Sequence, residues 1–157
     1  MIAGWGTDVM RQRVEAAVET SRLENLHFIG PVYSDEKHSL FASAEAFLLP
    51  STSEGLPMAV LEAMAHGTPV MVTEQCNLPD VAPAGAGICV QTDIQSIAAG
   101  IVSITEMSES ELKSMSHNAR QLVRRSYTWD VAAAQMADVY QWLLGGGPRP
   151  ASVAWID

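Results

Sequence analysis

The chain has 157 residues, the size of about one domain, and 48% of them are apolar, which is enough to build a buried core. The formal net charge is −9, with 9 Lys and Arg against 18 Asp and Glu, and this argues against a nucleic-acid partner. No apolar stretch approaches the ~20 residues that a transmembrane helix needs, so no transmembrane segment is expected.

Short apolar segments alternate with helical patterns along the chain. Strands are predicted over residues 1–3, 26–29, 46–49, 69–72 and 87–90. Helices are predicted over residues 8–21, 34–41, 57–66, 94–104, 109–125 and 129–144. Either Thr7 or Asp8 is suited to cap the first helix, with Val9, Val14, Ala17 and Val18 facing inward. Asp93, Ser108 and Thr128 are suited to cap the last three helices.

This alternation predicts an α/β fold, a Rossmann-like parallel sheet of about five strands with helices on both faces. Residues 1–147 are expected to form one domain, because no repeat and no second core is visible. Residues 148–157 follow a run of three glycines and are expected to be a flexible tail. A strand at Met1 suggests that the chain begins inside a domain.

The most informative stretch is the segment from Pro50 to Val70, which contains Glu54 and Glu62. It predicts a loop, a short helix that begins at Pro57, and a stop at Gly67. Ligands of open α/β sheets bind outside the carboxyl ends of the strands, and this loop follows such an end. The helix N-terminus suits a phosphate, and Gly55 allows the backbone to approach a ligand closely.

The helical periodicity alone gives Glu62 a simpler role. Val60, Leu61 and Met64 form one apolar stripe, and Glu62 falls nearly opposite to it. That position is typical of a solvated face. The hydroxyls of residues 51–53 are likewise explained either by an ordinary loop or by contacts with a ligand.

The two cysteines and the histidines predict no metal site. Cys76 and Cys89 have neither CxxC spacing nor a histidine at metal-ligand spacing, so two reduced thiols are expected.

The run Ser51-x-x-Glu54-Gly55-Leu56-Pro57, followed by Glu62-Ala63-Met64-Ala65-x-Gly67-x-Pro69-Val70, resembles the Glu-x7-Glu signature of retaining glycosyltransferase family 4. Members of this family have the two-domain GT-B fold. The resemblance extends over residues 1–144 and includes Gly4-Trp5-Gly6, residues 26–32 and residues 85–90. It implies that the chain is the C-terminal, donor-binding domain of such an enzyme.

The resemblance also implies roles for individual residues. Glu54 would be the catalytic residue that holds hydroxyls of the donor sugar, and Glu62 would accept hydrogen bonds from the ribose of the nucleotide. The segment from Gly30 to Val32 would lie along the base. The donor-binding residues implied are Ser53, Gly55, Leu56, Pro57, Met58, Glu62, Gly30, Val32, Gly4 and Gly6. The family uses a nucleotide sugar as substrate, and neither a cofactor nor a metal is expected.

Several departures from the family pattern limit what the chain is expected to do alone. The family's phosphate-binding Arg and Lys and its N-terminal domain, which binds the acceptor glycan or lipid, would precede Met1. Lys37 is the only Lys or Arg between Arg22 and Lys113 in the sequence. Asn77-Leu78 replaces a glycine-rich turn. The isolated chain is therefore expected to be inactive, and the complete protein to be cytoplasmic or peripheral to the inner membrane.

The missing first strand of the family fold leads to a prediction about the sheet. The five strands would close up in the order 2-1-3-4-5, or a second copy of the chain would complete the sheet as a homodimer. Two other functions stay open from the sequence. One is a non-catalytic module that binds a nucleotide or a protein, and the other is a nucleotide-sugar epimerase, which the Glu54 and Glu62 pattern fits less well.

Overall fold

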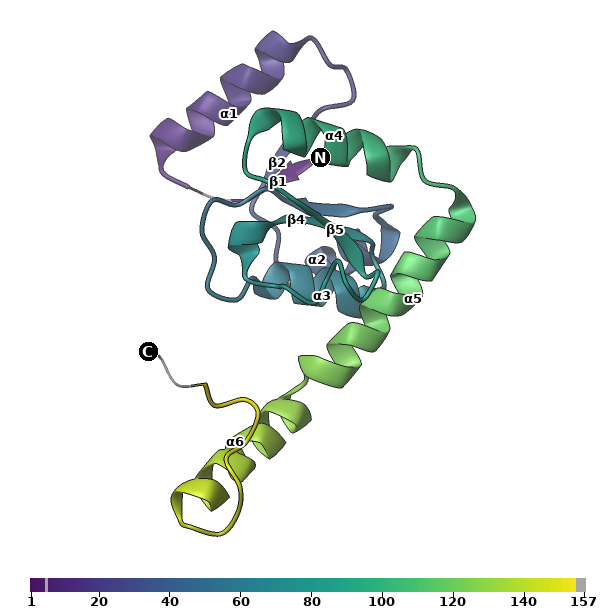
Figure 1. Cartoon of the computed structure of the whole chain (residues 1–157). Coiled ribbons are helices and arrows are strands. Elements are labelled where there is room, and N and C mark those ends of the chain that lie inside the picture. The colour runs from purple at the N-terminus through teal and green to yellow at the C-terminus, as the bar shows by residue number, and fades with distance from the viewer. Residues whose placement is uncertain (5, 155–157) are drawn as a thin grey trace. The chain divides into compact units, whose positions relative to one another are not determined.

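The computed structural model describes residues 1–4 and 6–154 (Figure 1). Trp5, the middle residue of the predicted glycine turn, lies outside them. Contacts along the chain divide it into two compact units, residues 1–40 and residues 41–157, and each unit is described by itself. In the described residues no helix is both long and apolar enough to cross a membrane.

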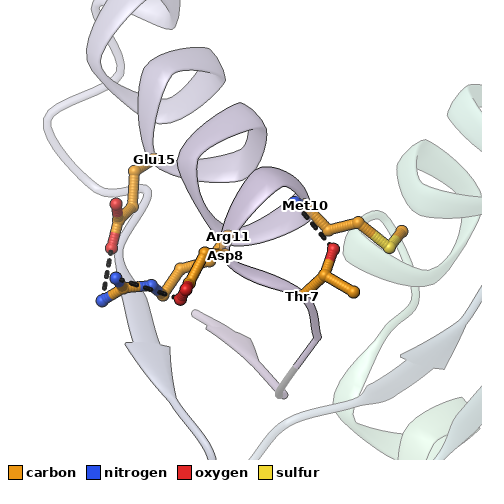
Figure 2. A network of polar contacts seen from close by, with 5 residues as sticks. All are labelled: Thr7, Asp8, Met10, Arg11 and Glu15. Carbon is orange, nitrogen blue, oxygen red and sulfur yellow. Dashed lines mark hydrogen bonds and ion pairs between the residues drawn. The ribbon is translucent and has the colours of Figure 1, made fainter.

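The first unit contains a two-stranded parallel sheet and a helix. Strand β1 (Ile2–Ala3) pairs with β2 (Phe28–Gly30), and α1 (Asp8–Ser21) connects them. The side chain of Thr7 accepts a hydrogen bond from the Met10 N–H at 3.4 Å, so Thr7 is the N-cap of α1 (Figure 2). Arg11 lies between the carboxylates of Asp8 and Glu15 on the next turns of the same helix (Figure 2).

The inward face predicted for α1 is only partly correct. Val14 and Val18 are half-buried, whereas Ala17 is exposed and 60% of Val9 is exposed. Helix α1 contains no buried residue among those the structure describes. Val9 stands in the first turn of α1, two residues after the N-cap Thr7.

The second unit contains the main parallel sheet. Strand β4 (Val70–Thr73) lies between β3 (Phe47–Leu49) and β5 (Gly87–Val90), and all three run parallel. The other elements begin with α2 (Ser34–Ser43), which spans the boundary of the units, and continue with α3 (Met58–His66), the 3-10 helix η1 (Glu74–Cys76), α4 (Ile94–Thr105), α5 (Glu109–Ser126) and α6 (Trp129–Leu143). Asp93, Ser108 and Thr128 are the N-caps of α4, α5 and α6, which confirms these three predictions.

Helices cover both faces of this sheet (Figure 1). On one face, Val70 and Val72 belong to a core cluster with buried residues of α3 and α5, among them Met64 and Leu122. On the other face, α4 approaches β4 at Gly100. A Cβ atom there would come within 2.6 Å of the sulfur of Met71, so only glycine permits this distance between helix and sheet. The α/β class with parallel strands is therefore confirmed.

The predicted order of the strands is wrong. All five strands are present, but β1 pairs with β2 in one parallel sheet and β3, β4 and β5 form another. The sheet therefore does not close in the order 2-1-3-4-5. Strand β1 has two residues, and its register shifts between Ile2 and Ala3, so it offers few hydrogen bonds for a second partner. Completion of the sheet by a second copy stays a prediction.

Candidate functional site

The candidate site lies at the carboxyl edge of the three-stranded sheet. The register pairs Leu49 with Val72 and Thr73 with Val90, so β3, β4 and β5 end at nearly the same level. Three connections therefore leave the sheet side by side, namely residues 50–57, the turn that contains η1, and residues 91–93. The third connection is hydrogen-bonded to the second, because the Gln91 side-chain amide donates to the Glu74 carboxylate at 2.5 Å.

The first of these connections carries Glu54. Its backbone N–H donates to the carbonyl of Gln75 at 3.0 Å, and its carbonyl accepts a hydrogen bond from the side-chain amide of Asn77. Just before it, the Ser51 hydroxyl donates to the Ser53 carbonyl at 3.2 Å and accepts from the Ser53 N–H at 3.4 Å. Both backbone polar groups of Glu54 are thus hydrogen-bonded, and the residue is half-buried.

The residues after Glu54 present exposed backbone toward the start of α3. Gly55, Leu56 and Met58 are exposed, and Pro57 is buried. A Cβ atom added at Gly55 would meet nothing within 4 Å, and its φ is outside the left-handed region, so no contact within the chain requires glycine at this position. This leaves open space that a ligand can enter.

Helix α3 begins one residue later than predicted. Pro57 is its N-cap rather than its first residue, and it provides no side-chain cap. The N–H groups of Val60 and Leu61 already donate to the Pro57 carbonyl, at 3.0 and 3.3 Å. The N–H groups of Met58 and Ala59 precede the first intrahelical bond and carry the partial positive charge of the helix end.

Glu62 is more buried than its helical periodicity predicts. The residue is half-buried, and its Oε2 atom has essentially no contact with solvent. The prediction of a solvated face is therefore wrong. The periodicity describes only the side of α3 that packs against the sheet and α5, whereas the opposite side is also partly covered.

The first unit contains the other predicted site residues. The N–H of Gly4 donates to the carbonyl of Gly30 at 2.9 Å, so the ends of β1 and β2 lie together. Both glycines have positive φ, 150° and 73°, and a Cβ added to either would meet nothing within 4 Å. Gly6 precedes α1, and Val32 is half-buried.

Neither of two surface hollows in the second unit includes Glu54 or Glu62. One, of about 480 Å³, lies where α4 meets α5 and includes Met107 and Glu111. The other, of about 300 Å³, includes Asp80, Asn118 and Arg125. These two hollows therefore lie apart from the candidate site.

The thiols and the acidic residues suggest no other chemistry in the described chain. Partial burial and the nearby Glu74 carboxylate raise the pKa of the Cys89 thiol, which disfavours the nucleophilic thiolate. Cys76 is buried and donates to the Leu49 carbonyl at 3.4 Å. In residues 1–4 and 6–154 no group of three His, Cys, Asp or Glu side chains is placed to hold a metal ion.

Sequence reasoning missed the turn from Thr73 to Asn77 as a contributor to this edge. Asn77, which stands where the family has a glycine-rich turn, has a φ of 54° and so adopts the left-handed conformation. Asparagine tolerates this conformation better than most residues, and that property was the available signal.

Residues 1–122 match the family model for glycosyl transferases group 1. The chain belongs to this family. The group 1 match includes both glutamates, the turn at Asn77 and the glycines of the first unit.

Individual relatives agree with this assignment. The chain is 28% identical over 145 residues to the putative colanic acid biosynthesis glycosyltransferase WcaL of Salmonella typhimurium, covering 87% of this chain and 36% of the relative. It is 30% identical over 142 residues to the O-antigen chain mannosyltransferase B of Escherichia coli, covering 89% of this chain and 35% of the relative. This group 1 chain therefore spans slightly more than a third of the length of these relatives.

A solved structure supports the fold. The sucrose-phosphate synthase of Thermosynechococcus elongatus superposes with a TM-score of 0.73 at 26% identity, covering 92% of this chain and 38% of that one. The fold of this group 1 chain is accordingly that of the Rossmann-like glycosyltransferases.

Proposed function

We propose that this chain binds the donor of a glycosyl transfer, a nucleoside-diphosphate sugar, at the carboxyl edge of β3 and β4. The observation that carries this proposal is the fixation of Glu54 at that edge. Both its N–H and its carbonyl are hydrogen-bonded to the turn after β4, and the N-terminus of α3 follows four residues later. The sugar would lie against Glu54 and the diphosphate near the helix end.

The start of α3 supports the position of the diphosphate. The Met58 and Ala59 N–H groups lie at the end of the helix that carries a partial positive charge, which favours an anion. The open space at Gly55 lets the backbone come close to phosphate oxygens or sugar hydroxyls. Exposed Leu56 and Met58 provide apolar surface beside these polar groups.

Glu62 would bind the ribose. It stands on the second turn of the same helix, so a nucleotide whose diphosphate meets the N-terminus can reach it. Its Oε2 atom is shielded from solvent, while the residue as a whole is half-buried. A carboxylate accepts hydrogen bonds from two neighbouring hydroxyls, such as those of ribose.

The reaction proposed for the complete protein is transfer of the sugar to an acceptor hydroxyl with retention of the anomeric configuration, as in family 4. Glu54 would orient sugar hydroxyls next to the reacting carbon, because positioning lowers the barrier of such a transfer. The similarity to a protein named a mannosyltransferase places mannose donors among those to be tested first.

Charge sets an upper limit on the affinity of the isolated chain. Residues 38–112 contain no Lys or Arg and hold both glutamates. A diphosphate there receives no charge-assisted hydrogen bond from a Lys or Arg of residues 38–112, each such bond being worth about 1.5–3 kcal/mol. We therefore expect dissociation constants on the order of 1 mM or higher, equivalent to about −4 kcal/mol.

The test is a titration of the isotope-labelled chain, monitored by NMR, with a panel of nucleoside diphosphates and nucleoside-diphosphate sugars. Shifts should concentrate at residues 54–62. Absence of shifts there at 10 mM of every ligand would exclude a dissociation constant of about 1 mM and would refute donor binding by this chain at that affinity. Free mannose and inorganic phosphate are controls for binding of one fragment only.

A further inference from the structure

The loop that carries Glu54 obtains its fixed shape from another segment of the chain. Residues 50–57 contain no helix or strand, so their backbone polar groups need partners from elsewhere. Those partners come from the segment Thr73–Asn77, here called the clamp turn. Its hydrogen bonds reach the backbone of Leu49, Ser51 and Glu54.

The clamp turn has a buried half. Thr73 and Cys76 are 1% and 0% exposed, and the Thr73 hydroxyl donates to the Ser51 carbonyl at 2.5 Å. The Cys76 thiol donates to the Leu49 carbonyl at 3.4 Å and lies 3.5 Å from the Thr73 hydroxyl. This half fixes the start of the loop where it leaves β3.

The exposed half fixes Glu54 itself. The carbonyl of Gln75 accepts from the Glu54 N–H at 3.0 Å, and the Asn77 amide donates to the Glu54 carbonyl. Asn77 can do this because it adopts the left-handed conformation, at φ 54°, while its N–H closes η1 on the Glu74 carbonyl at 3.4 Å. Glycine would permit the same backbone, but it would have no amide to donate.

We propose that Asn77 is a positioning residue that sets the Glu54 carboxylate for contact with the donor sugar, acting through the Glu54 carbonyl. The proposal rests on the proposed function for its ligand. Two hydrogen bonds hold the backbone of Glu54. One is made with the backbone carbonyl of Gln75, and the other with the side-chain amide of Asn77. Loss of the amide should therefore loosen the loop at Glu54 without altering α3 or Glu62.

The variant Asn77→Gly tests this directly, because glycine retains the left-handed backbone and removes only the side chain. Asn77→Asp is the second variant, since a carboxylate of the same shape repels the Glu54 carbonyl. The matched control is Asn118→Ala. It removes another side-chain amide of the same unit. That amide lies on α5 and donates a hydrogen bond of 3.2 Å to the Gly85 carbonyl.

Two readouts separate the positioning role from the proposed function. Amide hydrogen exchange at residues 51–56 should become about five- to tenfold faster in Asn77→Gly, as expected for the loss of one hydrogen bond, and should stay unchanged in Asn118→Ala. Affinity for a nucleoside-diphosphate sugar should fall about threefold or more, whereas affinity for the nucleoside diphosphate should not change.

Each result decides one proposal. Unchanged exchange at residues 51–56 in both Asn77 variants would overturn the positioning role, and so would an equal loss of affinity for both ligands. If the unmodified chain binds no nucleotide ligand, donor binding fails, and the exchange measurement still shows whether Asn77 fixes the loop.

Discussion

The guanidinium of Arg120 donates a hydrogen bond to the backbone carbonyl of His66 at 2.8 Å, so α5 closes the C-terminal end of α3. Cations at this end of a helix stabilise its last carbonyls. Gly67 follows with a φ of 78°, and a Cβ atom there would overlap the guanidinium. The conformation of this position favours glycine, and a larger residue would also displace the end of the Arg120 side chain.

Arg120→Ala should lower the free energy of unfolding by about 1 kcal/mol, because it removes one charged hydrogen bond at an exposed position. Chemical denaturation measures this change. Arg124→Ala, on the exposed side of the same helix, is the control and should change stability by less than ~0.5 kcal/mol. Equal effects of the two substitutions would show that the contact with His66 contributes nothing.

Gly100→Ala should destabilise the fold, by about 1–3 kcal/mol, although alanine normally favours a helix over glycine. The added Cβ would lie 2.6 Å from the sulfur of Met71 and 2.8 Å from a methyl group of Val90. Thermal unfolding shows directly whether the substitution lowers or raises the stability of the fold. An increase in stability would mean that α4 does not approach the sheet as closely as described.

Gly55→Ala should leave stability within about 0.5 kcal/mol of the unmodified chain, because nothing lies within 4 Å of the added Cβ. The same variant should weaken binding of nucleotide sugars, since the methyl group would occupy the space that the ligand is proposed to enter. Gly87→Ala is the contrast, because its Cβ would come within 2.5 Å of the Val70 carbonyl oxygen and must destabilise the sheet. Undiminished binding by Gly55→Ala would argue against a ligand at this loop.

The capping box of α5 should make part of its stability depend on pH. The Ser108 hydroxyl and N–H donate to the Glu111 carboxylate and hold the pKa of Glu111 below its ordinary value. A carboxyl with a lowered pKa stabilises the fold above its unfolded-state pKa, and this contribution is lost as the pH falls through the folded-state value. Glu111→Gln should therefore be less stable than the unmodified chain at pH 7, and the difference should shrink below about pH 4.

An NMR titration of the carboxyl groups checks this assignment. Ser108→Ala should raise the pKa of Glu111 toward its ordinary value and leave that of Asp93 low, because Asp93 is held by Ser96 at the start of another helix. A Glu111 pKa that does not respond to Ser108→Ala would contradict the capping box.

Local rules predicted most elements, because their causes lie within a few residues. Asp93, Ser108 and Thr128 cap helices through their own side chains, and Gly67 ends α3 in the left-handed conformation. The apolar run at residues 69–72 predicted a strand, and β4 is present there. The run at residues 46–49 predicted a buried strand, but the residues of β3 are only half-buried. The caps, the helix stop and the strands can each be read from a short window of sequence.

What could not be predicted depends on residues distant in the chain. Asn77 contacts Glu54 across 23 positions, and Thr73 contacts Ser51 across 22. The burial of Glu62 depends on what covers the outer side of α3, which helical periodicity does not encode. The division of five strands into two sheets likewise depends on pairing between segments and on the irregular register of β1.

Binding by the two glutamate variants tests the central claim most directly. Dissociation constants of a nucleoside diphosphate and of its sugar derivative should be measured for the unmodified chain, Glu54→Gln and Glu62→Gln. Donor binding as proposed predicts that Glu62→Gln weakens both ligands alike, whereas Glu54→Gln weakens only the sugar derivative. Equal losses for both ligands in both variants, or no loss in either, would contradict the assigned roles.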